Sequence, residues 1–363
     1  MKILFVTDLY PVKDDEKLTP KTLLNFVKGF EREGVEVDVI KPNFIFNSFI
    51  RRKPFYKTAQ YENVLNINYW LPFLGNITKK LNKIYHVAED VSIIVSHMPS
   101  GSIFAHKLSK KLNRPLVCGI HVSDIDVLTK PLYSIYFKKA LLSAFRDAKL
   151  LACRSCVIKK RLIELYPEFE QKIFTAYSGI PESIIVKRDD NVFNYPIKVL
   201  TCANFKKRKN IDKVIKALKG LDGFELTCIG EGIEKRKLQK LDHNVKFTGL
   251  LPHDKVLDFM RQSDIFILPS AGETFGMVYL EAMASGCITI GTENDGIDGI
   301  IVNGKNGFLT KPDAAKIREI LLEIKNLNTD NIKQLRQNAF KTVCDYTQDN
   351  MNRNYLQQIF KIL

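Results

Sequence analysis

The feature that most restricts how this chain can fold is an alternation of short apolar runs with amphipathic helical segments. The run KILFVT at 2–7 is rich in β-branched residues, and apolar residues at helical spacing follow from about Lys21 until Gly34. The same sequence of strand and helix recurs along the chain. Strands that alternate with helices predict parallel sheets built from βαβ units.

The strand pattern occurs in two series, and this predicts two domains. The first series comprises the runs at 2–7, 35–40, 91–96, 115–120, 150–153 and 172–177. After a polar stretch, the second series comprises the runs at 197–204, 224–230, 245–250, 264–270 and 287–292. We therefore expect an α/β protein with Rossmann-like domains at 1–185 and 190–345. A helix within 346–363 is expected to pack back on the first domain.

Composition excludes several other classes of protein. Hydrophobic residues make up 45% of the 363 residues, enough to build a core, so the chain is not expected to be disordered. No stretch reaches the ~18 apolar residues of a membrane span, and the run before Asp8 is too short for a signal peptide. Cys153 and Cys156 form one CxxC with no second pair, so we expect no metal site and seven reduced cysteines in a cytoplasmic protein.

The most informative segment is DIFILPSAGETFGMVYLEAMASGCITIGT at 264–292. It predicts an apolar strand, a loop, a helix from about Gly276 to Gly286, and another strand. A helix N-terminus offers unpaired backbone amides and partial positive charge, and glycine lets an anion approach without a Cβ in the way. We expect the amides of Gly276, Met277 and Val278 to bind a phosphate.

Two carboxylates flank this predicted phosphate site. Glu273 lies in the loop and Glu281 lies in the helix. Each can accept hydrogen bonds from hydroxyl groups, so the arrangement suits a nucleoside diphosphate with a hydroxylated ring on either side. The alternative is that Glu273 is only a loop charge and Glu281 a solvated helix residue.

The run GETFGMVYLEAMASG resembles the signature of glycosyltransferase family 4, whose members are retaining enzymes of the GT-B fold. The resemblance implies two Rossmann-like domains that face a cleft. It implies that Glu273 contacts the donor sugar and Glu281 the ribose. The backbone of Phe275 and Gly276 would face the phosphates, and we include Thr274 in the same donor site.

Further matches extend the resemblance to about residues 2–345. AYSGIP at 176–181 is similar to the turn that ends the family's first domain, and 295–312 is similar to its closing loop and strand. VKFTGLLP at 245–252 resembles the segment whose backbone, here near Leu251, faces the nucleobase.

A basic segment, CANFKKRKNIDKVIKAL at 202–218, resembles the family's Arg-Leu-x-x-x-Lys-Gly segment. The Arg and Lys of that segment clamp the diphosphate. Lys209 falls in the Lys position, but Asn204 stands in the Arg position, which removes one charge from the leaving-group site. Arg208 and Lys206 are the candidates to replace it. Alternatively, KKRK at 206–209 is a solvated or nucleic-acid-binding patch.

In the first domain, GIHVSDID at 119–126 resembles the family's His-Gly-Ser-Asp segment. The resemblance makes His121 the active-site histidine that faces the donor sugar, with Asp124 beside it. The first loop departs from the family pattern, since it reads Lys-Leu-Thr-Pro-Lys at 17–21 and has no glycine pair. Thr19 and Lys21 are the residues that could take over its role.

The resemblance implies transfer with retention, without a metal ion or other cofactor. The helix N-terminus and Lys209 are expected to stabilise the departing nucleoside diphosphate. UDP is expected rather than GDP, by family habit.

Net charge is +15, and residues 51–161 hold 20 basic and 6 acidic residues, a local charge of +14. Aromatic residues are interleaved with these basic ones, which suits an anionic membrane surface. We expect a glycan or lipid-linked saccharide as acceptor, in cell-surface polysaccharide synthesis, and a peripheral location on the inner face of the membrane. No nucleic-acid-binding motif is visible. Two alternative functions are a UDP-sugar epimerase on the same scaffold and a non-enzymatic basic binding protein. The alternative to a membrane surface is that the aromatic residues belong to the core.

Overall fold

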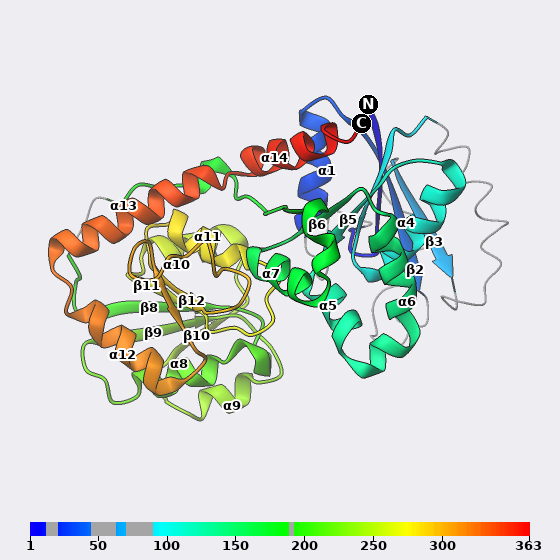
Figure 1. The fold of residues 1–363 in the computed structure, drawn as a ribbon. Helices are drawn as coiled ribbons and strands as arrows, with labels where there is room; N and C mark the ends of the chain where they lie inside the picture. Colours follow the sequence, from blue (N-terminus) through cyan, green and yellow to red (C-terminus); the bar gives the residue numbers. More distant parts are fainter. Residues whose placement is uncertain (12–20, 45–62, 70–89, 189–191) are drawn as a thin grey trace. The chain divides into compact units, whose positions relative to one another are not determined.

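The computed structural model describes residues 1–11, 21–44, 63–69, 90–188 and 192–363, which form two compact units (Figure 1). The first unit comprises Met1–Arg154, Ile158–Tyr177 and Met351–Leu363. The second unit comprises Ser155–Val157 and Ser178–Asn350. Each unit is an α/β structure around a parallel sheet, so the predicted fold class is confirmed.

The first unit contains, within its described residues, a seven-stranded parallel sheet in the order β3-β2-β1-β4-β5-β6-β7. Its strands are β1 (Lys2–Thr7), β2 (Glu36–Phe44), β3 (Val64–Tyr69), β4 (Ile93–His97), β5 (Leu116–Ile120), β6 (Leu150–Cys153) and β7 (Ile173–Thr175). Side chains alternate along β1, so that Ile3 and Phe5 enter one core and Leu4 and Val6 the other. The sheet is therefore buried on both faces, as parallel sheets usually are.

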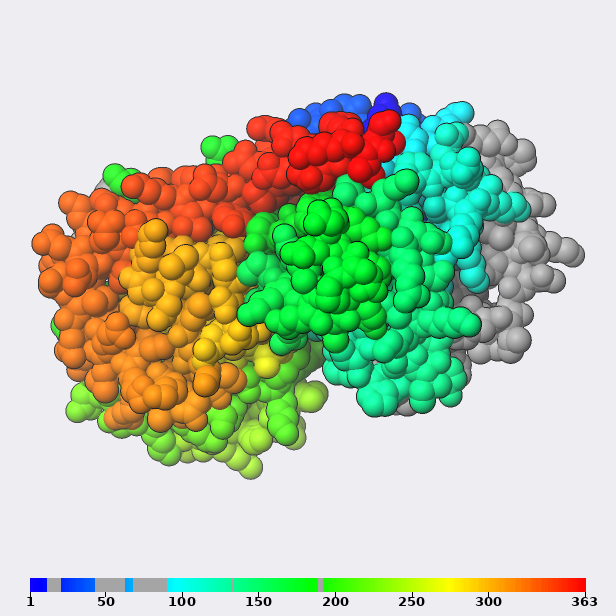
Figure 2. Space-filling model, viewed as in Figure 1, coloured from blue at the N-terminus to red at the C-terminus, as the bar shows by residue number. Residues whose placement is uncertain are grey.

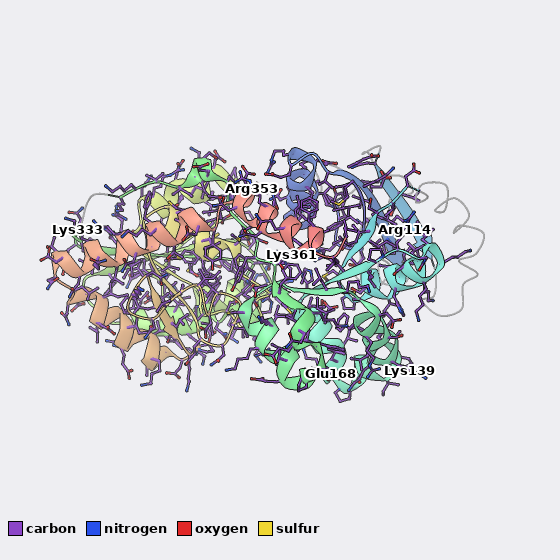
Figure 3. All side chains as sticks on the ribbon, turned by 45° about the horizontal axis from the view of Figure 1, so that its top comes forward. Arg114, Lys139, Glu168, Lys333, Arg353 and Lys361 are labelled. Atoms are coloured by element: carbon purple, nitrogen blue, oxygen red, sulfur yellow. The ribbon has the colours of Figure 1, made fainter. Side chains whose placement is uncertain are left out.

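Helices cover both faces of this sheet. They are α1 (Thr22–Arg32), α4 (Pro99–Leu112), α5 (Val122–Thr129), α6 (Pro131–Asp147), α7 (Cys156–Leu165) and α14 (Gln348–Phe360). α4, α6 and α7 supply Phe104, Leu141 and Leu162 to the core of one face. α1 and α14 lie side by side on the other face (Figure 2), where Arg353 of α14, labelled in Figure 3, pairs with Glu33 at 2.9 Å.

The second unit contains, in the part of the chain that is described, a six-stranded parallel sheet in the order β10-β9-β8-β11-β12-β13. Its strands are β8 (Ile197–Cys202), β9 (Phe224–Ile229), β10 (Lys246–Gly249), β11 (Ile265–Ile267), β12 (Ile288–Thr292) and β13 (Phe308–Thr310). Its helices are α8 (Ile211–Leu218), α9 (Lys235–Gln239), α10 (His253–Arg261), α11 (Met277–Ala284), α12 (Ala314–Lys325) and α13 (Thr329–Asp345). Short 3-10 turns lie at Pro167–Lys172, Glu182–Ile184 and Lys207–Lys209.

Both faces of the second sheet are again covered. Ile265 and Ile267 of β11 enter the core that α8 and α12 share, whereas Phe266 packs edge-on against Tyr279 of α11. This alternation places α11 directly against β11, the strand that precedes it in the chain. The carboxyl end of β11 and the N-terminus of α11 are joined by the loop that carries the predicted donor residues.

The division between the units lies earlier than the predicted boundary at 185–190, because the segment after Tyr177 is bonded to the second unit. Ile180 exchanges backbone hydrogen bonds with Tyr346 and Gln348, and the Val186 amide donates to the Ala284 carbonyl. The chain then returns to the first unit, because Met351–Leu363, which includes most of α14, belongs to that unit. The strand β3 was not predicted, because its alternating polar residues suit an edge strand with a weak apolar signal.

All seven cysteines carry thiols, and burial raises the pKa of several of them, including Cys118 to about 12. Among the described residues, no helix combines the length and the apolar character that a bilayer span requires.

Candidate active site

The loop between β11 and α11 forms the centre of the candidate site. Gly276 is the N-cap of α11 and has a φ of +88°, a left-handed conformation that glycine adopts without strain. A Cβ on Gly276 would lie 2.5 Å from the Tyr279 ring, which is buried and donates its hydroxyl to the Leu268 carbonyl at 2.6 Å. Glycine therefore lets the helix begin directly against the strand, with its first amides at the end of the loop. The first amides of a helix have no acceptor within it.

Glu273 lies in this loop, and its carboxylate is bonded to cationic side chains. Its Oε1 accepts hydrogen bonds from Lys209 Nζ, from Arg208 at 2.7 Å and from the Ser270 hydroxyl at 2.5 Å. Burial raises the pKa of Glu273, but Lys209, the Ser270 hydroxyl and Arg208 together more than offset this, so the pKa lies below its ordinary value. In the described part of the chain, Oε2 accepts no hydrogen bond. The carboxylate is thus ionised and keeps one oxygen for a hydroxyl donor.

The backbone of Glu273 is held by a residue that the sequence did not point to. Asp295, in the loop after β12, accepts the Glu273 amide through both carboxylate oxygens at 2.9 and 3.1 Å. The neighbouring Gly296 makes this approach feasible, because a Cβ there would lie 2.7 Å from the Phe275 amide nitrogen. The only signal in the sequence was the DGIDG run within the 295–312 match, which did not indicate a partner for Glu273.

Of the predicted diphosphate clamp, the structure brings Lys209 and Arg208 to the loop. Arg208 also contacts the carbonyls of Ala271 and Gly272, at 3.3 and 3.5 Å, and its side chain is 47% exposed. Asn204 is exposed, and within the described residues its side chain makes no hydrogen bond. Lys206 is exposed as well. Geometry thus favours Arg208 over Lys206 as the second cation at this loop.

Glu281 lies in the second turn of α11, and its side chain is 17% exposed. Its Oε1 lies 3.0 Å from Nε2 of His253, the first residue of α10, and this hydrogen bond raises the pKa of His253. A ribose that binds Glu281 must share the carboxylate with His253 or displace it. The half-buried Leu251 lies two residues before His253, on the same β10–α10 connection. His253 was not predicted as a site residue.

The remaining predicted donor residues of the second unit lie on the same short segment. Phe275 is buried and anchors the loop, whereas Thr274, Met277 and Val278 are half-buried at the start of α11. Sequence spacing alone brought these residues together, because they belong to one loop and one helical turn.

His121 and Asp124 belong to the first unit and follow the carboxyl end of β5. His121 is the N-cap of α5, is 8% exposed, and donates its backbone amide to Asp124 Oδ2 at 2.9 Å. Asp124 is fully buried, and burial raises its pKa well above the ordinary value. Asp124 therefore orients the backbone of His121, rather than reaching the surface itself. Of the first loop, Thr19 lies outside the described residues, and Lys21 is exposed just before α1.

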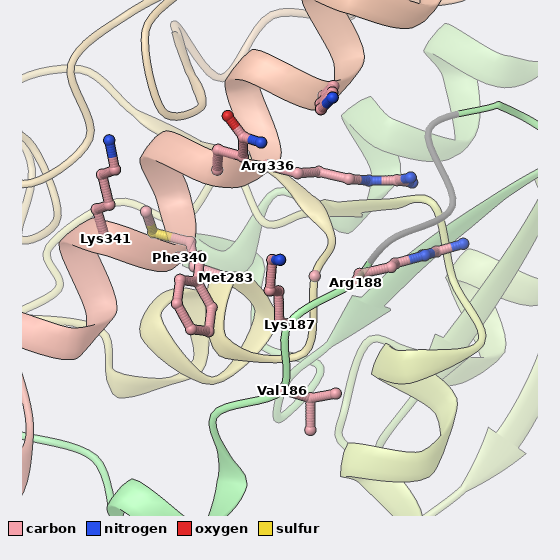
Figure 4. A pocket seen from close by; sticks show the side chains of 10 residues that line it. Val186, Lys187, Arg188, Met283, Arg336, Phe340 and Lys341 are labelled. Carbon is pink, nitrogen blue, oxygen red and sulfur yellow. The ribbon is translucent and has the colours of Figure 1, made fainter.

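A separate cavity of about 620 Å³ lies in the second unit, at the far end of α11 from Gly276 (Figure 4). Its lining carries five basic side chains, at Lys187, Arg188, Lys333, Arg336 and Lys341. Two of these pair with the buried Asp264, Arg188 at 3.1 Å and Arg336 at 3.6 Å. The arginines thus join α13 and the 186–188 segment to Asp264, the residue directly before β11. Within the described residues, no group of three or more His, Cys, Asp or Glu side chains is arranged to hold a metal ion.

Comparisons with known proteins identify the family of the chain. Residues 20–183 match the model described as Glycosyltransferase Family 4, and residues 185–342 match the one described as Glycosyl transferases group 1. An uncharacterized glycosyltransferase of Methanocaldococcus jannaschii is 28% identical over 348 residues, covering 93% of this chain and 92% of the relative. The amylovoran biosynthesis glycosyltransferase AmsK of Erwinia amylovora is 28% identical over 278 residues, covering 70% and 67%.

Solved structures share the fold. The Anabaena protein HepE in complex with UDP superposes with a TM-score of 0.77 at 19% identity, covering 99% of this chain and all of that one. The two parallel-sheet units are those of the GT-B fold. The chain belongs to glycosyltransferase family 4, as the resemblance of its signature predicted.

Proposed function

We propose that this glycosyltransferase transfers a hexosyl or related sugar from a nucleotide sugar, with UDP as the nucleotide, to a hydroxyl group of a glycan or lipid-linked saccharide. The observation that carries the donor assignment is the arrangement around α11. Glu273, whose Oε2 accepts no hydrogen bond from the described residues, lies on one side of the helix N-terminus, and Glu281 lies one turn into the helix. The complex of the similar HepE with UDP is consistent with this nucleotide.

The proposed chemistry needs a stabilised leaving group and little else. The bond from the anomeric carbon to the phosphate oxygen breaks, and the acceptor oxygen forms its bond on the same face, so configuration is retained. The acceptor proton passes to the departing phosphate oxygen. Lys209 and the amides of α11 offset the charge that develops on the diphosphate, which is why we expect transfer without a metal ion.

A thermal-shift panel of nucleotide sugars tests the donor assignment. A ligand at about 100 times its Kd stabilises the folded protein by about 2.7 kcal/mol. UDP-sugars should raise the melting temperature, and Glu281→Ala should remove most of that rise because it removes the proposed ribose contact. A panel in which no nucleoside diphosphate sugar raises the melting temperature would sink the proposed function.

Arg208 is expected to supply the charge that Asn204 lacks at the diphosphate. Arg208→Ala should weaken UDP binding by about 10-fold, as expected for a lost charged hydrogen bond worth about 1.5–3 kcal/mol, measured by titration calorimetry. Lys207→Ala is the matched control, since Lys207 lies in the same 3-10 turn, is exposed, and carries the same charge. Equal Kd values for the two variants would leave Arg208 without a role in donor binding.

The acceptor and the polysaccharide context are proposed from relatives and from charge. AmsK is named for amylovoran biosynthesis, and we propose a corresponding role in cell-surface polysaccharide synthesis for this chain. The membrane surface was predicted from the basic residues in 51–161 and from the aromatic residues interleaved with them, which begin at Phe49. Many of them lie outside the described residues, namely Phe49, Arg51, Arg52, Lys53, Phe55, Tyr56, Lys57, Trp70, Phe73, Lys79, Lys80 and Lys83.

The described part of 51–161 supports membrane association at α6. Ile135 and Tyr136 are 77% and 63% exposed, and Lys139, labelled in Figure 3, is exposed beside them. An apolar pair next to basic side chains is the composition of an interfacial anchor. We propose that this α6 patch, made of Ile135, Tyr136 and Lys139, contacts anionic lipid on the cytoplasmic face.

Vesicle co-sedimentation tests the α6 patch. The double variant Ile135→Ser, Tyr136→Ser should bind anionic vesicles about tenfold more weakly, since burying such a side chain fully is worth about 1.5–3 kcal/mol. Ile233→Ser is the control, because Ile233 is 88% exposed in the second unit. Binding of the unaltered protein should also weaken as salt is raised. Equal binding by the double variant and the control, or binding insensitive to salt, would contradict the proposed membrane contact.

A further inference from the structure

A chain of buried polar side chains in the first unit ends at His121, and the proposed function does not use its other members. Nδ1 of His97, the last residue of β4, lies 3.0 Å from His121 Nε2. Nε2 of His97 lies 3.2 Å from the hydroxyl of Tyr355, on α14. His97 and Tyr355 are 0% and 1% exposed, so the chain reaches the surface only at His121, which is 8% exposed.

The surrounding residues pack closely around this hydrogen-bond chain. The His97 ring lies across β5 at Gly119, where a Cβ would be 2.1 Å from His97 Nδ1. Phe5 stacks on the same ring, with centroids 5.2 Å apart. Tyr355 meets Phe26, Phe30 and Phe174 edge-on, with centroids 5.4–5.5 Å apart. Aromatic packing of this kind restricts the positions that the rings of His97 and Tyr355 can take.

The imidazoles of His97 and His121 are neutral. Burial, with a smaller contribution from the charge of Arg154, lowers the pKa of His121 to about 3 and that of His97 well below its ordinary value. Arg154 is itself fixed, because its guanidinium lies 4.4 Å from the centre of the Phe26 ring and donates to the Ala176 carbonyl at 2.5 Å. Burial also raises the pKa of Tyr355, so its hydroxyl keeps its proton.

Neutral imidazole carries one hydrogen on one of its two nitrogens, so the contact between His97 and His121 holds a single hydrogen. If His97 donates through Nδ1, then Tyr355 donates to His97 Nε2 and the hydrogen of His121 is on Nδ1. If His121 donates through Nε2, then His97 donates through Nε2 to the Tyr355 oxygen. In both arrangements, which nitrogen of His121 bears the hydrogen is coupled through His97 to whether the Tyr355 hydroxyl donates or accepts.

We propose that His97 and Tyr355 are positioning residues that hold the ring of His121 and couple its tautomer to the Tyr355 hydroxyl, so that the C-terminal helix α14 takes part in the active site of the first unit. The inference rests on the proposed function only in its last step, in which His121 faces the donor sugar. The hydrogen-bond chain itself is independent of that step.

Tyr355→Phe is the decisive variant, because it keeps the ring and its packing but removes the hydroxyl. With isotope-labelled histidine, the ring nitrogens of the six histidines can be followed by NMR. We expect the signals of His97 and also of His121 to move in Tyr355→Phe, although His121 does not contact Tyr355. Turnover of the donor found in the nucleotide-sugar panel should fall about tenfold, with its KM unchanged, by analogy with a metal-ligating histidine that loses its outer hydrogen bond.

Arg353→Ala is the control, since it breaks the Glu33 ion pair that joins α14 to α1 but removes no member of the hydrogen-bond chain. It should leave the histidine signals and the turnover as they are in the unaltered protein. Gly119→Ala supplies a second route, because it displaces the His97 ring and should give the same change at His121. Unchanged His121 signals in Tyr355→Phe would overturn the inference. Failure of every nucleotide sugar to bind would instead sink the proposed function and leave the NMR result standing.

Discussion

Replacing Lys209 with Ala is expected to lower turnover by about 100- to 1,000-fold, the loss measured when one group that stabilises a developing negative charge is removed. Lys209 is the least exposed cation at the loop, at 12%, and it bonds to Glu273 within a largely buried pair. A charge in such a site is weakly screened by water and therefore acts strongly on a leaving diphosphate. Turnover of the donor selected by the nucleotide-sugar panel provides the measurement.

Stability should change far less than turnover in this variant. Glu273 retains Arg208 and the Ser270 hydroxyl when Lys209 is removed, so its carboxylate is not left buried without a partner. Glu273→Ala is expected to lower turnover by a similar factor to Lys209→Ala, because it removes the proposed contact to the donor sugar. Near-normal turnover in either variant, at an unchanged melting temperature, would refute the assignment. Lys206→Ala serves as the control for the loss of one positive charge.

Gly276→Ala is expected to have the second large effect, through backbone geometry rather than charge. Alanine at a φ of +88° costs about 1–2 kcal/mol, and the clash of its Cβ with Tyr279 adds about 1–3 kcal/mol. Tyr279 cannot move aside easily, because it is buried and its hydroxyl is bonded to Leu268. The start of α11 should therefore shift, and the Kd for UDP should rise by at least tenfold in a calorimetric titration.

Gly272→Ala separates the clash from the backbone strain. Gly272 lies in the same loop with a φ of +76°, but nothing lies within 4 Å of the position its Cβ would occupy. It should lose stability by the strain alone, about 1–2 kcal/mol, and keep most of its affinity for UDP. Equal losses of affinity in the two variants would show that the N-terminus of α11 is not the site of the phosphates.

The sequence predicted the fold class and the strand–loop–helix unit of the donor site. Glu273, Gly276 and Glu281 lie on one loop and one helix, so their spacing in the chain determines their spacing in space. The expectation that Lys209 lies near them came from the family resemblance, and its contact with Glu273 spans 64 residues. The donor roles of all these residues, and those of Thr274, Asn204 and Leu251, stay predictions.

Other members of the site could not be predicted, because they depend on how loops and strands distant in the chain pack together. Asp295 holds the Glu273 amide only because β11 and β12 are neighbours and Gly296 allows the next loop to approach. Arg208 and Lys206 were equal candidates in the sequence, and the direction of the 3-10 turn brings Arg208 to the loop.

What the sequence by itself determined is local: the apolar periodicity of each strand and helix, and the loop glycine that opens α11. These follow from propensity and side-chain periodicity, which act over a few residues. Only the tertiary structure decided that Tyr355 lies beside His97, 258 residues away, because that contact exists once α14 covers the sheet of the first unit. Such pairings depend on the packing of whole elements, and no pattern within either segment specifies them.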